Sequence, residues 1–343
     1  MKRSCLALFF LYAVLVFAGG GIGGCASRNL QDPGFNLFKR DGYAELLERQ
    51  QASMSDDPAS AEKKLPDMTS ADHERLGDAY SQQGKPDLAF LQYTKALQKK
   101  PDSPELLYKR GVIFLRKGMN EAAIKDFQAI LEKNTSHDLA HQGLGQAYFK
   151  MRSYQEAEKQ FQLAVKLNPK LWVSYDFLGI IYDYQQKSAG AIEQYKSAIA
   201  IRPGDASLYN NLGVSYSLMG DYEKAVEAFG EGLRISPGDA RLSNNLGMVL
   251  CKLGRNIEAI EVFRASGDEA RAYNNMGCFF LQDGEYASAI RAFERAIQLR
   301  SGTYAQASEN LQKAEAALQA MAPFSEEDQK PSSKSKLFGF TLP

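Results

Sequence analysis

Glycine recurs along this chain at a fixed interval. Six glycines are each 34 residues from the next and a seventh follows after 30, at Gly77, Gly111, Gly145, Gly179, Gly213, Gly247 and Gly277. Five equal steps in a row are hard to obtain by chance, and a self-similar period of roughly 20 to 50 residues is the mark of a solenoid. Solenoids present a long groove rather than a closed active site, so the period also argues against an enzyme.

Other residues repeat together with the glycine. An aromatic residue follows three positions later in six of the seven units, and an alanine follows twelve positions later in all of them. A second aromatic comes at sixteen, as Tyr93, Phe127, Phe161, Tyr195, Phe229, Phe263 and Phe293. Prolines close four units, at Pro101, Pro169, Pro203 and Pro237. This pattern resembles the tetratricopeptide repeat, a 34-residue helix-turn-helix unit.

The resemblance implies an all-α fold, a right-handed superhelix or α-solenoid. Apolar residues at helical spacing, such as Leu208 and Leu212 before the turn and Phe229 and Leu233 after it, indicate two amphipathic helices that face each other. Glycine on one helix and alanine on the other let the axes approach while the aromatics fill the space beside them. We expect seven repeats over 70–299, in units 70–103, 104–137, 138–171, 172–205, 206–239, 240–269 and 270–303, and a cap helix at 304–321.

The first residues are typical of a targeting segment. A basic start is followed by an apolar run from Leu6 to Ala18 that is too short to span a bilayer comfortably, so residues 1–24 are interpreted as a signal peptide. Ile22-Gly23-Gly24-Cys25 resembles the lipobox of bacterial lipoproteins, which implies that Cys25 becomes an N-terminus carrying palmitate and other lipid chains. The alternative is an ordinary secretory signal with an incidental cysteine. Residues 25–69 would then form the lipidated N-terminus and a tether.

Composition and residue types set further limits. Lysine plus arginine equals aspartate plus glutamate, at 41 each, so no strong field steers the chain to nucleic acid. His137 and His141 lack the surrounding ligands of a metal site, and no phosphate loop or nucleophile motif occurs, so we expect no catalytic residue, cofactor or metal. The tail 322–343 is expected to be disordered, either as an idle tail or as a docking motif around Leu337-Phe338-Gly339-Phe340.

Cys251 and Cys278 would be the thiols left after signal removal and lipidation, in an oxidising compartment. Both fall on first helices of neighbouring repeats. Either they form a disulfide between repeats six and seven, or they are two small buried residues.

The first helices supply the candidate binding groove. In tetratricopeptide arrays the residues just before the conserved Leu-Gly pair point into the concave surface, and here they are Asn210, Asn211, Asn244, Asn245, Asn274 and Asn275. Because an amide side chain both donates and accepts, the resemblance implies that these residues bind the main chain of an extended peptide. The alternative is that they tie neighbouring helices together.

Charged and aromatic residues of the same helices indicate what such a peptide would carry. Asp176, Asp183 and Tyr184 lie in repeat four, while Arg241 and Arg271 line the later part. We expect a ligand with a basic or apolar stretch and an acidic end.

A lipidated signal, a tether and a seven-repeat array resemble bacterial envelope lipoproteins, in particular the tight-adherence (TadD-like) pilus assembly lipoproteins and the type IV pilus pilotins. The resemblance implies a non-catalytic scaffold, anchored by lipid in the outer membrane and facing the periplasm, that binds a protein or extended peptide such as a secretin or pilus component. The alternative is a holdase-like chaperone for exported subunits.

Overall fold

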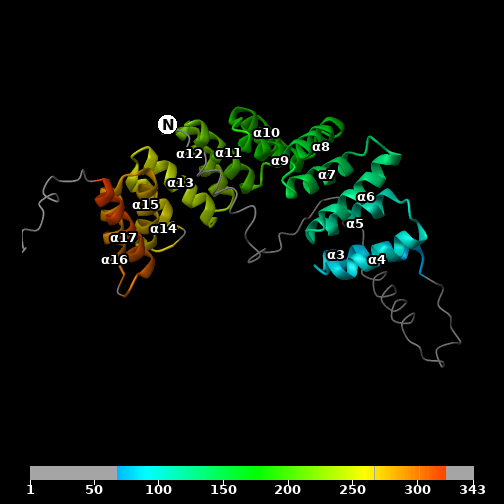
Figure 1. Cartoon of the computed structure of the whole chain (residues 1–343), viewed down its shortest axis with the longest axis horizontal. Coiled ribbons are helices and arrows are strands. Elements are labelled where there is room, and N and C mark those ends of the chain that lie inside the picture. Colours follow the sequence, from blue (N-terminus) through cyan, green and yellow to red (C-terminus); the bar gives the residue numbers. More distant parts are fainter. Residues whose placement is uncertain (1–67, 266, 301, 322–343) are drawn as a thin grey trace, which may run out of the picture. The chain divides into compact units, whose positions relative to one another are not determined.

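The computed structural model describes residues 68–265, 267–300 and 302–321, and all regular secondary structure in those ranges is helical (Figure 1). Each repeat consists of two consecutive helices, and a single C-terminal helix follows the last repeat. Their bounds are α3 Ser70–Gln82, α4 Pro86–Lys99, α5 Pro104–Arg116, α6 Asn120–Lys133, α7 Asp138–Lys150, α8 Tyr154–Leu167, α9 Trp172–Tyr184, α10 Ser188–Ile201, α11 Ala206–Met219, α12 Tyr222–Ile235, α13 Ala240–Lys252, α14 Asn256–Ala265, α15 Glu269–Asp283, α16 Tyr286–Gln298 and α17 Ala305–Met321.

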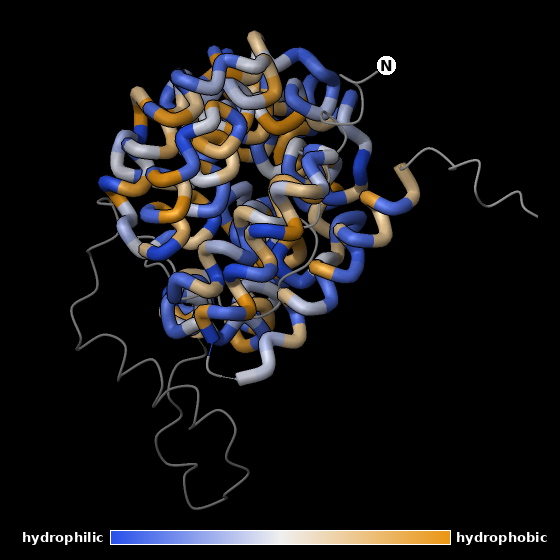
Figure 2. The backbone as a smooth tube through the Cα atoms, turned by 90° about the vertical axis from the view of Figure 1, so that its left-hand side faces the viewer, coloured by the Kyte–Doolittle hydropathy of each residue, from blue (hydrophilic) through white to orange (hydrophobic). Residues whose placement is uncertain are grey.

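The prediction of an all-α fold made of paired helices is therefore confirmed. The chain divides into two compact units, the first ending at Asp221 and the second beginning at Tyr222. The first unit contains α3 to α11 and the second contains α12 to α17. Hydrophobic and hydrophilic residues alternate along the helices, as amphipathic helices require (Figure 2).

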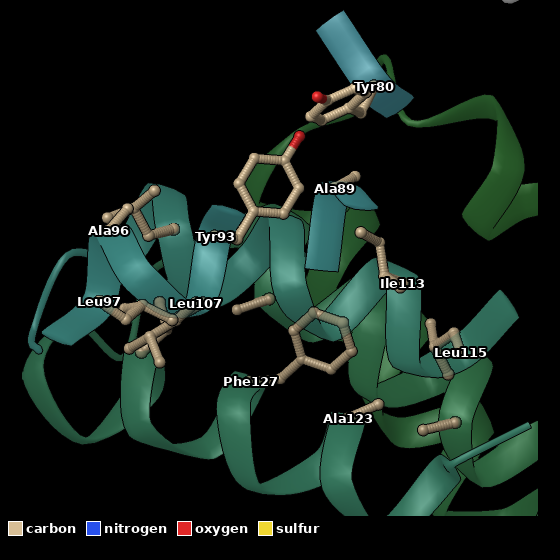
Figure 3. Packing of buried hydrophobic residues seen from close by; sticks show 14 of the residues in the cluster. Tyr80, Ala89, Tyr93, Ala96, Leu97, Leu107, Ile113, Leu115, Ala123 and Phe127 are labelled. Atoms are coloured by element: carbon tan, nitrogen blue, oxygen red, sulfur yellow. The ribbon is translucent and has the colours of Figure 1, made fainter. Parts of the chain in front are cut away.

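The repeat glycines sit where the two helices of a pair come closest. A Cβ placed on Gly77 would lie 2.5 Å from the ring of Tyr93, and one on Gly111 would lie 2.7 Å from the ring of Phe127. Both rings lie inside the packing between helices, near alanines of the second helices (Figure 3). The ring of the second aromatic thus fills the space that the glycine leaves open, which is why the two residue types repeat together.

Within each unit the first helices also contact one another, as in the pairs α5 with α7, α7 with α9, α9 with α11, α13 with α15 and α15 with α17. Inside the units, a first helix thus packs against its own second helix, as in α5 with α6, α7 with α8 and α13 with α14, and against the first helix of the next repeat. Polar residues on the first helices face their counterparts one repeat away, and this arrangement positions the candidate site.

Repeat six has a shortened second helix. Its α14 spans 10 residues, whereas the second helices of the first five repeats span 14. Asp268 then caps α15, accepting a hydrogen bond from the backbone N–H of Arg271 at 2.7 Å. The interval between the last two repeat glycines is thus short because α14 ends about one turn early.

Several sequence predictions lie outside the described residues. They concern the signal peptide 1–24, Cys25 with nearly all of the segment 25–69, and the tail 322–343. Within residues 68–265, 267–300 and 302–321, none of the helices combines the length and the apolar character needed to cross a bilayer.

Candidate functional site: the faces of the first helices

A polar contact recurs between the first helices of neighbouring repeats. The residue two positions before the repeat glycine donates to the residue three positions before the glycine of the preceding repeat. Lys109 Nζ lies 2.7 Å from Glu74 Oε1, Asn211 Nδ2 lies 2.9 Å from Asp176 Oδ1, and Asn275 Nδ2 lies 3.1 Å from Asn244 Oδ1. We call each of these contacts an inter-repeat tie.

The inter-repeat ties use side chains that the sequence offered as peptide ligands. Asn274 follows the same rule toward the cap helix: it is 3 % exposed, and its Oδ1 accepts from Asn310 of α17 at 3.2 Å. Asn210 Nδ2 donates to Asn211 Oδ1 at 3.4 Å, and Asn245 is half-buried in α13. Of the two interpretations left open above, the geometry favours amides that hold neighbouring helices together.

Repeats three and four depart from this rule. The residues at the donating position are Gly143 and Phe177, which have no side-chain donor. Gly143 is required there because a Cβ would lie 2.5 Å from the ring of Phe127 in the preceding repeat. Phe177 instead stacks on Phe161 with ring centroids 5.0 Å apart and an interplanar angle of 7°.

An aromatic cluster occupies the place where the ties are missing. Phe149 of α7 lies 4.9 Å from Phe177 and 5.5 Å from Tyr154, centroid to centroid. Tyr154 stacks on Tyr184 at 5.0 Å, with 20° between the rings. All four side chains are half-buried, so the cluster, consisting of Phe149, Tyr154, Phe177 and Tyr184, presents part of its apolar area to solvent.

An open pocket of about 720 Å³ adjoins the cluster at Tyr154, within the range of roughly 300 to 1,000 Å³ that ligand pockets span. It lies between the helix-to-helix turns of repeats three and four, and we call it the turn pocket; its lining residues are Arg152, Ser153, Tyr154, Gln155, Glu156, Glu158, Gln185 and Lys187. Glu158 accepts from Gln185 Nε2 at 2.8 Å and from Gln162 Nε2 at 3.0 Å. Gln185 Oε1 is buried without a hydrogen-bond partner among the described residues.

The turns beside this pocket carry an unusual backbone. Each turn between paired helices contains one residue with positive φ, seven positions after the repeat glycine, and in five repeats it is glycine with φ between 69° and 81°. In repeats three and four it is Arg152 with φ 61° and Gln186 with φ 59°. A side chain in the left-handed region costs about 1 to 2 kcal/mol. The two strained turns are therefore the two that border the pocket.

The acidic residues predicted for the groove are engaged inside the first unit. Asp183 is 8 % exposed, and its Oδ2 accepts from Ser215 Oγ at 2.6 Å and from Tyr195 Oη at 3.3 Å. Burial raises the pKa of Asp183 to about 6, against the lowering effect of the hydrogen bonds from Ser215, Ser188 and Tyr195. Burial likewise raises the pKa of Asp176 to about 6, opposed by the hydrogen bond from Asn211.

The pKa of Tyr184 is raised to about 12, first by burial and then by the neighbouring phenol of Tyr154. Tyr184 is thus a neutral hydroxyl at ordinary pH and contributes an aromatic surface rather than a charge. Of the three residues singled out in repeat four, Tyr184 is the one that belongs to the aromatic cluster.

The two arginines lie in the second unit, at the beginnings of helices. Arg241 Nη2 pairs with Asp239 Oδ2 at 3.1 Å, and the side chain of Arg271 lies beside Gly267. The carboxylates of Asp176 and Asp183 accept hydrogen bonds within the first unit, and the predicted ligand with a basic or apolar stretch and an acidic end stays a prediction.

The structure records Cys251 and Cys278 as free thiols, so it does not contain the disulfide considered from the sequence. Cys251 is buried in α13, while Cys278 Sγ faces α17, 3.5 Å from Asn310 Nδ2. Burial raises the pKa of both thiols, that of Cys251 to about 12. They behave as small core residues.

Sequence reasoning did not single out Phe149, Tyr154, Arg152 or Gln186. A signal was available: Arg152 and Gln186 replace glycine at a position that is glycine in the five other repeats. Once the period is known, a residue that departs from it indicates a repeat with a role other than helix packing.

Comparison with protein-family models places this architecture in a class. Models described as TPR repeat match residues 77–118 and 179–220, and models described as tetratricopeptide repeat match 105–135, 138–171, 206–239 and 270–303. Together they cover more than half of the chain. The chain therefore belongs to the tetratricopeptide repeat family, whose members mediate protein–protein interactions and act as non-catalytic scaffolds.

Solved structures share the fold. A tetratricopeptide repeat protein from Parabacteroides merdae is 18 % identical with a TM-score of 0.50, over 72 % of this chain and 98 % of that one. PilF of Pseudomonas aeruginosa is 16 % identical with a TM-score of 0.51, over 78 % and 99 %. MamA is 30 % identical with a TM-score of 0.43, over 48 % and 97 %. A search of curated proteins finds no match.

Proposed function

We propose that this protein is a scaffold that binds an extended segment of a partner protein on the first-helix face of repeats three and four. The observation that carries this proposal is the aromatic cluster. Phe149, Phe177 and Tyr184 are half-exposed at the place where the inter-repeat ties stop and the helices keep apolar surface available. Aromatic side chains supply large contact area at low conformational cost, and they are enriched where proteins bind one another.

We further propose that the scaffold is anchored in a bacterial envelope by lipid on Cys25, in the outer membrane and facing the periplasm. The support is the sequence Ile22-Gly23-Gly24-Cys25 after a basic start and an apolar run. Ala26 and Ser27 follow, without the aspartate that would suggest retention in the inner membrane. The order of signal, tether and repeat array supports a role in assembling a pilus or a secretion machine, with a secretin or pilus component as partner.

Site-specific photo-crosslinking in intact cells tests the binding face. A photoreactive phenylalanine replaces Phe149 or Tyr184, and Leu163, which is 41 % exposed on α8, serves as the control position. We expect one defined protein to be captured from positions 149 and 184 and to stay in a stable complex, whereas position 163 captures none. Equal capture from all three positions would refute the proposed binding face. Capture of many different exported proteins at positions 149 and 184 would indicate the holdase instead.

A further inference from the structure

The charged residues that line the turn pocket indicate which kind of ligand it can bind. Two of its four charged residues, Glu156 and Glu158, are anions, and Arg152 and Lys187 are cations. Glu158 is committed to Gln162 and Gln185 through two hydrogen bonds. Glu156 lies in the first turn of α8, where a carboxylate stabilises a helix whose N-cap makes no side-chain hydrogen bond.

The cations have no comparable role. Within the described part of the chain, neither Arg152 nor Lys187 takes part in an ion pair, although both border the same pocket. Arg152 and Lys187 line this pocket together with Tyr154, whose ring stacks on Tyr184. The turn pocket thus combines the half-buried ring of Tyr154 with two positive charges that form no ion pair among the described residues.

Two unfavourable features coincide here. Arg152 holds a left-handed backbone that glycine occupies in five other repeats, and Gln185 Oε1 is a buried acceptor with no partner among the residues described. A buried acceptor without a donor costs about 1 to 3 kcal/mol. Strain and unpaired polar atoms persist where the surroundings or a ligand compensate for them.

From these contacts we infer that the turn pocket binds an internal peptide segment in which an aromatic side chain stands next to an aspartate or glutamate. The aromatic side chain packs on Tyr154, Tyr184 and Phe149, and the carboxylate pairs with Arg152 and Lys187. The pocket is open along the surface, which lets the bound chain continue at both ends. This inference rests on the proposed scaffold function and adds the chemistry of the bound segment.

Peptide selection on the full-length protein tests the chemistry. Random peptides displayed on phage are selected, and the affinity of the enriched sequences is measured by fluorescence anisotropy of labelled synthetic copies. We expect enriched peptides to contain an aromatic residue beside an acidic one. Their binding should weaken by about tenfold or more in the Arg152→Glu and Lys187→Glu variants, because each reversal removes a charge-assisted contact.

The matched control is Lys170→Glu. It reverses the charge of an exposed lysine outside the pocket lining and leaves both pocket cations in place, so peptide affinity should be unchanged. A second comparison uses each peptide with its internal acid replaced by the amide, and with a free or an amidated C-terminus. Loss of binding on replacing the internal acid supports the inference, whereas dependence on the free C-terminus would overturn it.

Other results are equally decisive. An enriched set without acidic residues, an empty selection, or binding that both charge reversals leave intact would overturn the inference. If Phe149→Ser abolishes binding while the charge reversals do not, the proposed binding face is supported, and the inferred requirement for an acidic residue in the peptide is refuted. If the selected peptides bind but, when added before irradiation, do not reduce crosslinking of the partner at position 149, the proposed function fails separately.

Discussion

Asn211 donates a hydrogen bond to Asp176 in the first helix of the preceding repeat, with Nδ2 and Oδ1 2.9 Å apart. The contact links two residues 35 positions apart and has counterparts at Lys109 with Glu74 and at Asn275 with Asn244. An asparagine that resembled a peptide ligand is thus engaged in joining repeats. Gly143 and Phe177 stand at the donating position in repeats three and four and have no side-chain donor, and the aromatic cluster that we propose as the binding face lies beside them.

Removing the tie should destabilise the first unit. In Asn211→Ala, the half-buried Asp176 loses its donor, and we expect the free energy of unfolding to fall by about 1 to 3 kcal/mol. Urea denaturation followed by the fluorescence of Trp172, the one tryptophan of the chain, reports on this unit. Asn275→Ala breaks the corresponding tie in the second unit and should leave the Trp172 transition in place. Identical transitions for Asn211→Ala and the parent would contradict the role of the tie.

Stability of the first unit should depend on pH through Asp183. Its pKa is about 6 in the folded protein and near 3.8 when exposed, so the folded state binds a proton that the unfolded state does not. The stabilisation is complete below pH 4 and is lost as the pH rises through 6, by about 1 to 3 kcal/mol. Asp183→Asn should make this part of the curve less steep, as measured by urea denaturation between pH 4 and 7, and the remaining slope belongs to Asp176, whose pKa is also raised to about 6. An unchanged slope in that variant would refute the assignment.

Relieving the strained turns should stabilise the protein. Glycine in place of Arg152 or Gln186 removes a left-handed side chain but adds backbone entropy to the unfolded chain, so we expect a net gain of about 0.5 to 1 kcal/mol. The reverse change, Gly118→Gln, places a side chain at φ 74° with nothing within 4 Å of its Cβ, so backbone strain alone should make it destabilising. Thermal and urea unfolding measure both. A loss of stability in Gln186→Gly would count against strain at these turns.

The repeat glycine should tolerate no side chain. A Cβ on Gly179 would lie 2.6 Å from the ring of Tyr195, so Gly179→Ala forces the two helices of repeat four apart, at about 1 to 3 kcal/mol. Gly204→Ala is the matched control because nothing lies within 4 Å of its Cβ. The two variants should differ clearly in urea midpoint, and equal midpoints would mean that the ring moves aside without cost.

Lipid attachment should depend on Cys25. In Cys25→Ser, labelling with a palmitate analogue should disappear and the protein should leave the membrane fraction, since the proposed acyl chains, at about 0.8 kcal/mol per buried methylene, would no longer be attached. Cys278→Ser is the control and should keep both label and location. A membrane-bound, unlabelled Cys25→Ser protein would point instead to anchoring by the apolar run itself.

The sequence was sufficient for the helical pairs and insufficient for the site, for a physical reason. Gly77 with Tyr93 and Gly111 with Phe127 are packing partners inside one repeat, so their period reports the architecture directly. An asparagine amide, by contrast, satisfies a neighbouring carboxylate as well as it would a peptide, and only the geometry of Asn211 distinguishes the two.

The aromatic cluster could not be predicted from the period either, because Phe149 and Phe177 interrupt it. The acidic residues of repeat four looked exposed by position, yet Asp183 is drawn inward by Ser215 and Tyr195 from two other helices. Predicting that arrangement requires knowing which side chains of neighbouring repeats face each other.

The two non-glycine turns also have a consequence for how this gene responds to selection. At positions 152 and 186 the residues present are not those that maximise folding stability, and glycine at either would relax the backbone. A mutant library selected for heat resistance alone should drift to glycine at both codons. Selection that also requires partner binding should accept glycine at 186 and reject it at 152. The codons found at the two positions would then distinguish residues needed for folding from residues needed for ligand binding.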